Sequence, residues 1–365
     1  MRPQRTKKFL QMKTYKHLYP QICDFDNLYL AYRKARRGKR GKTQVFNFEF
    51  HEESELLRLQ DELIRQSYRP GAYTNFRLPD RKRRLISAAP FRDRVAHHAL
   101  CNLILPIFER KFIDDSYANR IGKGTHRALD RAQKFARRYP YVLQGDIVQF
   151  FPSIDHAILR AMLARPIADA PTLWLIDQIL ASGADIHVRQ YVMQWFPNDD
   201  LFARHRPRGL PIGNLTSQFW ANVYLNALDQ FVKRELECAA YVRYVDDFLL
   251  FADDKRALWQ WKARLAEFLQ SLRLVMHPRK STVYRVDDGV PFLGWRIFPT
   301  HRRLKREKVR DFIRRFRAQV SAYARGELAL ADLTTRTRAW LAHATHGETY
   351  HLRGRVFASI PISSA

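Results

Sequence analysis

Hydrophobic residues recur at helical spacing in some stretches of the chain and crowd into short runs in others. In the N-terminal part, the spacing predicts helices over about residues 25–36, 52–67 and 92–112. Two short strands, 74–80 and 84–87, are expected between the second and third of these helices. A hairpin with a basic tip would therefore separate two helical segments.

The same mixture continues to the C-terminus. The further predicted elements are a helix over 126–138, a strand starting at 141–143, a helix around 172–182, a short apolar piece at 191–196, a long helix over 214–237, a hairpin over 241–252, a helix over 258–272, strands within 283–298 and a basic amphipathic helix over 305–325. Helices around a small, mostly antiparallel sheet indicate an α+β fold.

Positive charge is in large excess. The 365 residues include 64 Lys and Arg against 36 Asp and Glu, a net charge of +28 that is spread along the whole chain. Such a protein repels itself unless it meets a polyanion, and nucleic acid fits because each neutralised phosphate releases counterions. A membrane surface is the rival polyanion, but no run of about 18 apolar residues and no lipidation motif supports it. The basic residues 1–44 fit either a solvated arm or a contact to nucleic acid.

Cysteine usage indicates a reducing compartment. The three cysteines, Cys23, Cys101 and Cys238, are not paired at metal-ligand spacing, and a secreted scaffold would usually carry more. The basic N-terminus is not followed by an apolar core of signal-peptide length. We therefore expect buried thiols and a cytoplasmic protein.

Candidate chemistry begins with two adjacent carboxylates, Asp246 and Asp247, at the tip of the hairpin predicted over 241–252. An acidic pair in a turn is more often structural than catalytic. However, Asp146 ends another short apolar strand, and carboxylates on neighbouring strands are suited to hold two divalent ions for displacement at phosphorus. Oxygen ligands and a phosphate substrate favour Mg²⁺. Considered alone, Asp146 is equally consistent with a turn residue or a helix N-cap.

A glycine-bearing segment, residues 208–218 (RGLPIGNLTSQ), lies between these carboxylates. Gly209 and Gly213 would allow the backbone to approach a flat partner such as a base. Considered by itself, this segment is an ordinary loop before a capped helix.

The order of these features resembles motifs A, B and C of reverse transcriptases: Asp146 after a strand, the glycine segment with its helix, and then Tyr-Val-Asp-Asp at 244–247. Residues 272–282 look like motif D, and 290–295 look like motif E, the primer grip. Upstream, 83–94 and 116–124 resemble fingers motifs of bacterial and group II intron enzymes. The resemblance covers roughly residues 65–345. It implies a right-hand polymerase with a basic extension at 1–44, fingers at 45–138, a palm at 139–300 that contains a fingers segment at about 160–205, and a short helical thumb at 301–365.

The resemblance also implies roles for individual residues. Asp146, Asp246 and Asp247 match the catalytic carboxylates, and Lys280 matches the motif D lysine that would protonate or neutralise pyrophosphate. Two Mg²⁺ ions, for which Mn²⁺ is an expected substitute, would be bound by these carboxylates and by Ile147. The set implied to contact the incoming deoxynucleoside triphosphate is Lys82, Arg84, Phe151, Ile212, Gly213 and Gln218. The set implied to contact template or primer is Arg120, Lys123, Phe292, Leu293 and Gly294.

One departure narrows the family. Most reverse transcriptases carry Gln-Gly-x-x-x-Ser-Pro in motif B, whereas this chain has Ile212 in place of Gln and Gln218 in place of Pro. That variant resembles the enzymes of diversity-generating retroelements. These enzymes copy a template-repeat RNA into error-prone cDNA and work with a small basic accessory protein, a pentamer. The resemblance thus implies RNA, nascent cDNA and that accessory protein as partners, and no membrane.

Three other functions stay open at this point. They are a group II-like or phage-defence reverse transcriptase, a non-catalytic RNA-binding or maturase-like protein, and an RNA-dependent RNA polymerase. Phe151 argues against the last, since an aromatic ring below the sugar would exclude a 2′-hydroxyl.

Overall fold

In the computed structural model, residues 13–77, 84–184 and 186–362 are described, and they form two compact units. The first unit consists of residues up to Ile113, Ile147–Phe231 and Ala266–Val275, and the second of Asp114–Asp146, Val232–Leu265 and Met276 onwards. Both contain helices and antiparallel strands, so the α+β prediction is confirmed.

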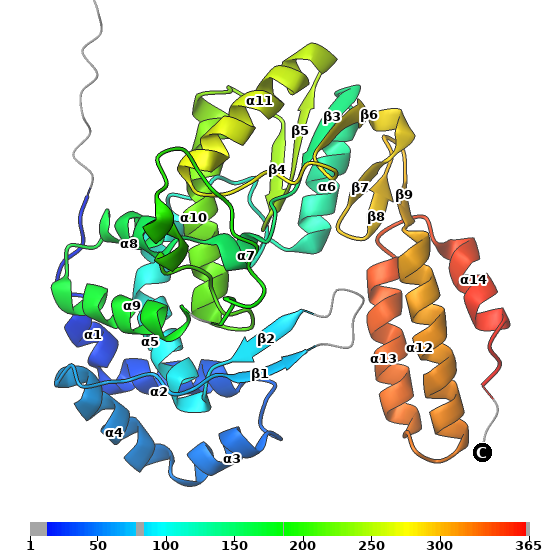
Figure 1. Ribbon diagram of the computed structural model, residues 1–365. Helices are drawn as coiled ribbons and strands as arrows, with labels where there is room; N and C mark the ends of the chain where they lie inside the picture. Colours follow the sequence, from blue (N-terminus) through cyan, green and yellow to red (C-terminus); the bar gives the residue numbers. More distant parts are fainter. Residues whose placement is uncertain (1–12, 78–83, 185, 363–365) are drawn as a thin grey trace, which may run out of the picture. The chain divides into compact units, whose positions relative to one another are not determined.

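The first unit is mainly helical (Figure 1). Its helices are α1 (Tyr19–Cys23), α2 (Phe25–Arg36), α3 (Thr43–Phe50), α4 (Glu52–Ile64), α5 (Phe91–Glu109), α7 (Phe150–Ser153), α8 (His156–Ala164), α9 (Ala170–Ser182), the 3₁₀ helix η1 (Leu201–His205) and most of α10 (Leu215–Arg234). Helix α2 packs along α5, where its buried face carries Leu28, Ala31 and Tyr32 at helical spacing. Asp24 begins α2 by accepting hydrogen bonds from the N–H groups of Asp26 and Asn27.

A two-stranded hairpin, β1 (Thr74–Arg77) and β2 (Leu85–Ala88), also belongs to the first unit. All four residues of β1 are exposed, whereas Ser87 in β2 is buried. The basic tip predicted between these strands, with Lys82, lies outside the described residues.

A four-stranded antiparallel sheet organises the second unit, in the order β4-β5-β3-β6. Its strands are β3 (Tyr141–Gly145), β4 (Tyr241–Tyr244), β5 (Asp247–Ala252) and β6 (Thr282–Arg285). Helix α6 (Thr125–Ala136) packs against β4 and β5. The predicted hairpin over 241–252 is confirmed.

The second unit continues with a smaller sheet, β7-β8-β9, and a helical C-terminal part. These elements, with the other minor ones, are η2 (Val286–Asp288), β7 (Val290–Phe292), β8 (Trp295–Ile297), β9 (Arg302–Leu304), most of α11 (Lys255–Ser271), α12 (Arg306–Ala324), α13 (Leu330–Ala344) and α14 (Tyr350–Ala358). One apolar core joins the face of α12 to both sheets, and Phe312 stacks on Trp340 of α13 with ring centroids 3.8 Å apart. The division into fingers, palm and thumb stays a prediction.

Candidate active site

The sheet of the second unit brings the predicted carboxylates to one end of neighbouring strands. Tyr244 pairs with Asp247 across a two-residue turn, and Gly145 of β3 pairs with Phe248 of β5. Asp146 directly follows Gly145, and Asp247 directly precedes Phe248, so these two residues are found at the same end of the strand pair. Asp246 is the second residue of the turn. Asp146 and the Asp246–Asp247 pair, 100 positions apart along the chain, are therefore found at the same end of the sheet.

Asp146 is held by the segment that leads into β6. Its carboxylate oxygen Oδ2 lies 2.6 Å from Nζ of Lys280, and its backbone carbonyl accepts a 2.7 Å hydrogen bond from the N–H of His277. The buried hydroxyl of Ser281 accepts from the Asp146 N–H at 3.3 Å. Asp146 itself is only 8% exposed. The sequence therefore positions this carboxylate through backbone and side chain together.

Gly145 explains how the strand before Asp146 fits its neighbour. A Cβ at this position would lie 2.2 Å from the ring of Phe248, far inside van der Waals contact. The Phe248 ring, which is fully buried, therefore occupies the space that any other residue at 145 would need.

The turn that carries Asp246 has unusual backbone geometry. Val245 has a φ of 57°, in the left-handed region that β-branched residues rarely adopt. Arg243, one of the largest fully buried side chains, donates a 3.1 Å hydrogen bond from its guanidinium to the Val245 carbonyl. A strained turn persists only where its surroundings over-determine it, and Arg243 supplies part of that restraint.

Arg243 also connects the hairpin to the basic loop 114–124. Its N–H donates to the carbonyl of Asp115 at 2.9 Å, and its carbonyl accepts from the N–H of Tyr117 at 3.0 Å. The buried carboxylate of Asp115 in turn accepts from Arg131 at 2.8 Å. Burial and the Asp115 charge raise the pKa of Tyr117 to about 12, so the phenol keeps its proton at neutral pH.

The two predicted template contacts of this loop have partners inside it. Arg120 donates to the carbonyl of Ser116 at 2.9 Å, and Lys123 donates to the carbonyl of Asp114 at 2.7 Å. Both cations thus stabilise the loop conformation. Their contact to a template stays a prediction.

The donor set at the end of β3 and the β4–β5 turn is suitable for Mg²⁺. Carboxylate oxygens are the ligands this ion prefers. Ile147 has a buried apolar side chain, so it could contribute only its carbonyl oxygen. Within the described part of the chain, no group of three or more His, Cys, Asp or Glu side chains is already arranged around a metal position. An ion bound by Oδ2 of Asp146 would have to replace the ammonium of Lys280 on that oxygen.

In the first unit, three of the predicted nucleotide-binding residues are associated with strand β2. The carbonyl of Ile212 accepts a 2.9 Å hydrogen bond from the N–H of Ser87, and Gly213 has a φ of 116°. A Cβ on Gly213 would lie 2.9 Å from Ile86. The exposed Arg84 directly precedes this strand. The structure thus brings Arg84, Ile212 and Gly213 to the same short strand.

Asn214 strengthens this association between the glycine segment and β2. Its amide nitrogen donates to the carbonyl of Ser87 at 2.8 Å, and its Oδ1 accepts from the N–H of Ala89 at 3.1 Å. Gln218 is half-buried in the first turn of α10.

Phe151 lies in the short helix α7, which begins after Gln149 in a left-handed conformation with a φ of 45°. Phe151 is half-buried, whereas its neighbour Phe150 is buried and meets it edge-on.

The three residues of the predicted primer grip are in different environments. Phe292 is buried in the core of the second unit, and Leu293 and Gly294 form the turn between β7 and β8.

Sequence reasoning missed three residues that position this site: Arg243, His277 and Ser281. A signal for Arg243 was present, because an arginine inside the apolar strand AAYVRYV must find buried partners. Nothing in the sequence marks His277, which acts through its backbone N–H.

Comparison with known proteins agrees with these observations. The family model described as reverse transcriptase (RNA-dependent DNA polymerase) matches residues 77–297. The chain is 26% identical over 310 residues to protein YkfC of Escherichia coli (strain K12), with 71% of this chain and 77% of YkfC covered. It is 24% identical over 355 residues to the group II intron-encoded protein LtrA of Lactococcus lactis subsp. cremoris, with 78% of this chain covered.

The chain spans only 57% of the length of LtrA. A solved structure, apo telomerase from Candida tropicalis, has a TM-score of 0.42 and 12% identity, covering 64% of this chain and 48% of that one. In the described part of the chain, no helix is long and apolar enough to span a membrane. The match over residues 77–297, more than half of the sequence, shows that this chain belongs to the reverse transcriptase family.

Proposed function

We propose that this protein copies an RNA template into DNA, with Asp146, Asp246 and Asp247 as its catalytic carboxylates. The observation that supports this most directly is the pairing of Gly145, directly before Asp146, with Phe248, directly after Asp247. The net charge of +28 suits a template–primer duplex as the bound partner.

In this proposal, Asp146, Asp246 and the carbonyl of Ile147 would hold two Mg²⁺ ions, and Asp247 contributes charge and turn geometry. When bound, Mg²⁺ supplies the positive charge that activates a primer hydroxyl and stabilises a departing pyrophosphate. Lys280, 55% exposed in its side chain, is able to turn from Asp146 toward that pyrophosphate and donate a proton to it.

Selection of the nucleotide is assigned to the first unit. The Arg84 guanidinium would bind phosphate oxygens of the incoming nucleotide through two parallel hydrogen bonds. The Phe151 ring would exclude nucleotides that carry a 2′-hydroxyl. Ile212, Gly213 and Gln218 would lie along the new base pair. These roles rest on the family resemblance, supported by the attachment of the Ile212–Gly213 backbone to β2.

The test is primer extension on a defined RNA template with the Asp246→Asn variant. We expect synthesis to fall by at least about 1,000-fold, since the carboxylate acts on the reacting groups, while the affinity for the template–primer duplex stays within about threefold. Normal synthesis by Asp246→Asn would refute the assignment of the carboxylates. No synthesis by the unaltered chain with Mg²⁺ or Mn²⁺ would refute the polymerase.

We further propose that copying is error-prone, as in a diversity-generating retroelement, with a small basic accessory protein as partner. The support is Ile212, whose aliphatic side chain is unable to donate a hydrogen bond near the nascent base pair as a glutamine would. Sequencing of cDNA made by the unaltered chain and by Ile212→Gln tests this. Fewer errors opposite adenine in the variant are expected, and an unchanged error spectrum would remove Ile212 from the explanation.

A second candidate is a role in intron splicing. Its support is the similarity to LtrA, and to nuclear intron maturase 1, mitochondrial, of Arabidopsis thaliana at 27% identity over 110 residues. Splicing of a bound intron RNA by the Asp246→Asn variant, in an assay without nucleotides, would favour this function over DNA synthesis.

A further inference from the structure

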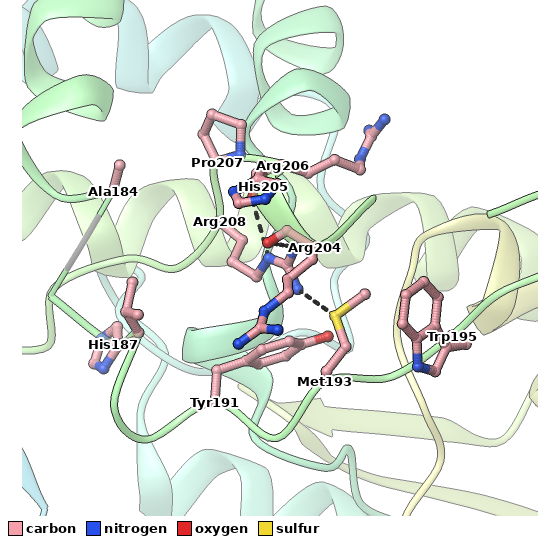
Figure 2. Close-up of a pocket in the computed structure, with 11 residues that line it drawn as sticks. Ala184, His187, Tyr191, Met193, Trp195, Arg204, His205, Arg206, Pro207 and Arg208 are labelled. Atoms are coloured by element: carbon pink, nitrogen blue, oxygen red, sulfur yellow. Dashed lines mark hydrogen bonds between the residues drawn. The ribbon is translucent and has the colours of Figure 1, made fainter. Parts of the chain in front are cut away.

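A solvent-open pocket of about 570 Å³ lies in the first unit, and Figure 2 shows the residues that line it. It is lined by Ala184 and by residues within 187–208, and none of these lining residues belongs to the predicted catalytic or nucleotide-binding sets. The sequence pattern predicted an apolar piece at 191–196. The structure has neither a helix nor a strand there, and alternate residues of the piece, Tyr191, Met193 and Trp195, line this pocket.

Although irregular, the segment is held firmly in place. Arg206 forms a bidentate ion pair with the buried Asp155 at 2.8 and 3.0 Å. The side chain of Gln149 donates to the carbonyl of Gln190 at 2.7 Å and accepts from the N–H of Val192 at 3.0 Å. The pocket is therefore largely formed before any ligand arrives, which lowers the entropic cost of binding.

One wall consists of aromatic and sulfur-containing side chains. The Arg208 guanidinium lies over the Tyr191 ring, 4.7 Å from its centroid, and donates to the sulfur of Met193 at 3.1 Å. Trp195 also lines the pocket, and 57% of its surface is exposed. Its indole is thus available as a platform for a flat ligand.

The charge of the lining selects the ligand class. The lining residues include three arginines and two histidines and no carboxylate. Arg204 and His205 are exposed at the end of η1, beside the aromatic wall. A ligand that combines a flat aromatic group with negative charge fits this lining, and a nucleotide is such a ligand.

The surface beyond the pocket favours a strand over a free nucleotide. Leu201 and Phe202, on the same 3₁₀ helix as Arg204, are 82% and 77% exposed. Apolar side chains beside cations suit the neighbouring bases of an unpaired strand.

We propose that this pocket binds one unpaired nucleotide of a single-stranded RNA, with its base on Trp195 and its phosphates near Arg204 and His205. The inference rests on the proposed function for the identity of the polyanion. It adds an RNA contact that would hold unpaired template in the first unit.

The experiment measures binding of a fluorescent uridine hexamer RNA by anisotropy, at several salt concentrations and without metal or nucleotides. We expect Trp195→Ala to weaken binding about 5- to 100-fold, the range for loss of one stacked base, and Trp195→Phe to keep most of the affinity. Arg204→Ala should lower the slope of log affinity against log salt by about 0.7, the value for one phosphate contact on a single strand.

The matched control is Trp259→Ala. Trp259 is 49% exposed and lies 4.8 Å from Lys262, so it is a similar surface tryptophan beside a cation, outside the pocket. Its variant should bind the hexamer as the unaltered chain does. A hexamer without bases should bind the Trp195→Ala variant and the unaltered chain equally, because it offers nothing to stack.

Three outcomes would overturn the proposal. They are unchanged hexamer affinity in a folded Trp195→Ala variant, an equal loss on the base-free strand, and uridine monophosphate binding at the same site as tightly as the hexamer. Variants that keep RNA affinity but lose a copurifying protein would make the pocket a protein-docking site. Since binding is measured without synthesis, RNA held through Trp195 by a chain that makes no DNA would refute only the polymerase.

Discussion

The ammonium of Lys280 lies 2.6 Å from the carboxylate of Asp146, across 134 positions of sequence. Two predictions made separately from the sequence, a metal-binding carboxylate and a lysine for the leaving group, thus concern one ion pair. The pair partly neutralises a corner of the sheet where Asp246 and Asp247 are also found. It implies that Lys280 and a divalent cation compete for Asp146.

Replacing Lys280 with alanine should separate the two roles. We expect Mn²⁺, observed directly by electron paramagnetic resonance, to bind about two- to fivefold more tightly, because a half-exposed ion pair contributes no more than about 1 kcal/mol. DNA synthesis should nevertheless slow by about 100-fold or more through loss of the proton donor. Lys262→Ala is the control and should leave both quantities unchanged. Weaker Mn²⁺ binding in Lys280→Ala would contradict the competition.

Arg243 should act as a positioning residue for the turn that carries Asp246. Because its guanidinium bonds the Val245 carbonyl from a fully buried position, we expect Arg243→Met to lower kcat by about 10-fold or more with little change in KM. Arg243→Lys should recover part of kcat, since lysine keeps the positive charge but lacks the planar guanidinium with its several N–H donors. Single-turnover extension measures this. A variant with normal kcat and lower thermal stability would reduce Arg243 to a structural role.

Phe151 should determine the choice of sugar. Phe151→Val is expected to raise ribonucleotide incorporation about 10- to 100-fold, the cost of one lost steric contact. The control is Phe150→Leu, a change in the adjacent buried ring that should affect stability and leave sugar selection alone. Competition between matched ribo- and deoxynucleotides gives the ratio. The same ratio of ribonucleotide to deoxynucleotide incorporation in both variants would show that Phe151 does not exclude ribonucleotides.

Buried histidines should make the fold sensitive to acid. Burial lowers the pKa of His97 from 6.5 to about 3, and in the described structure neither of its ring nitrogens has a hydrogen-bond partner. A lowered folded pKa means that His97 supports the fold above pH 6.5 and that this support is lost as pH falls toward 3.

We therefore expect His97→Leu to flatten the fall in melting temperature between pH 6.5 and 4. The slope of the free energy of unfolding against pH should decrease by up to about 1.4 kcal/mol per pH unit. The exposed His51, changed to leucine, should leave the slope unaltered. Identical pH profiles for His97→Leu and the unaltered chain would show that other groups control acid unfolding.

Local patterns predicted much of this fold. Helix α2 has the predicted bounds, Phe25–Arg36, and the hairpin over 241–252 has its turn at Val245–Asp246, because strong periodicity and paired apolar runs are local signals. Helix α8 was not predicted, although the Asp155 side chain begins it by accepting a hydrogen bond from the N–H of Ile158. In the C-terminal part, the helix predicted over 305–325 is confirmed as α12, whereas α13 and α14 were expected only as parts of a helical thumb without individual bounds.

The sequence predicted the candidate residues of the site but not the strand pairing that brings them to one end of the sheet. Motif order indicated Asp146, Asp246 and Lys280, yet no local signal places β3 between β5 and β6, a pairing that depends on contacts more than 100 positions apart. The segment 184–208 was unpredictable for another reason. Its conformation depends on side-chain anchors such as Arg206 to Asp155 and Arg273 to Asp199, and these have no periodicity.

Packing at Gly145 should be measurable through stability. Gly145→Ala inserts a methyl group into the Phe248 ring, and overpacking of this kind costs about 1–3 kcal/mol. Thermal unfolding should show a lower melting temperature, which Phe248→Leu in the same chain partly restores. Gly354→Ala, in helix α14 with no atom within 4 Å of the new Cβ, should be neutral or stabilising. Full stability of Gly145→Ala would mean that the ring moves aside freely.

The same close fit has an evolutionary consequence. A glycine that faces an aromatic ring across two strands links the histories of positions 145 and 248. Homologues that keep the aromatic ring at position 248 should have glycine at position 145. Homologues with a smaller side chain at 248 should accept other amino acids at 145. Substitutions at these two positions should therefore arise together among descendants of a common ancestor.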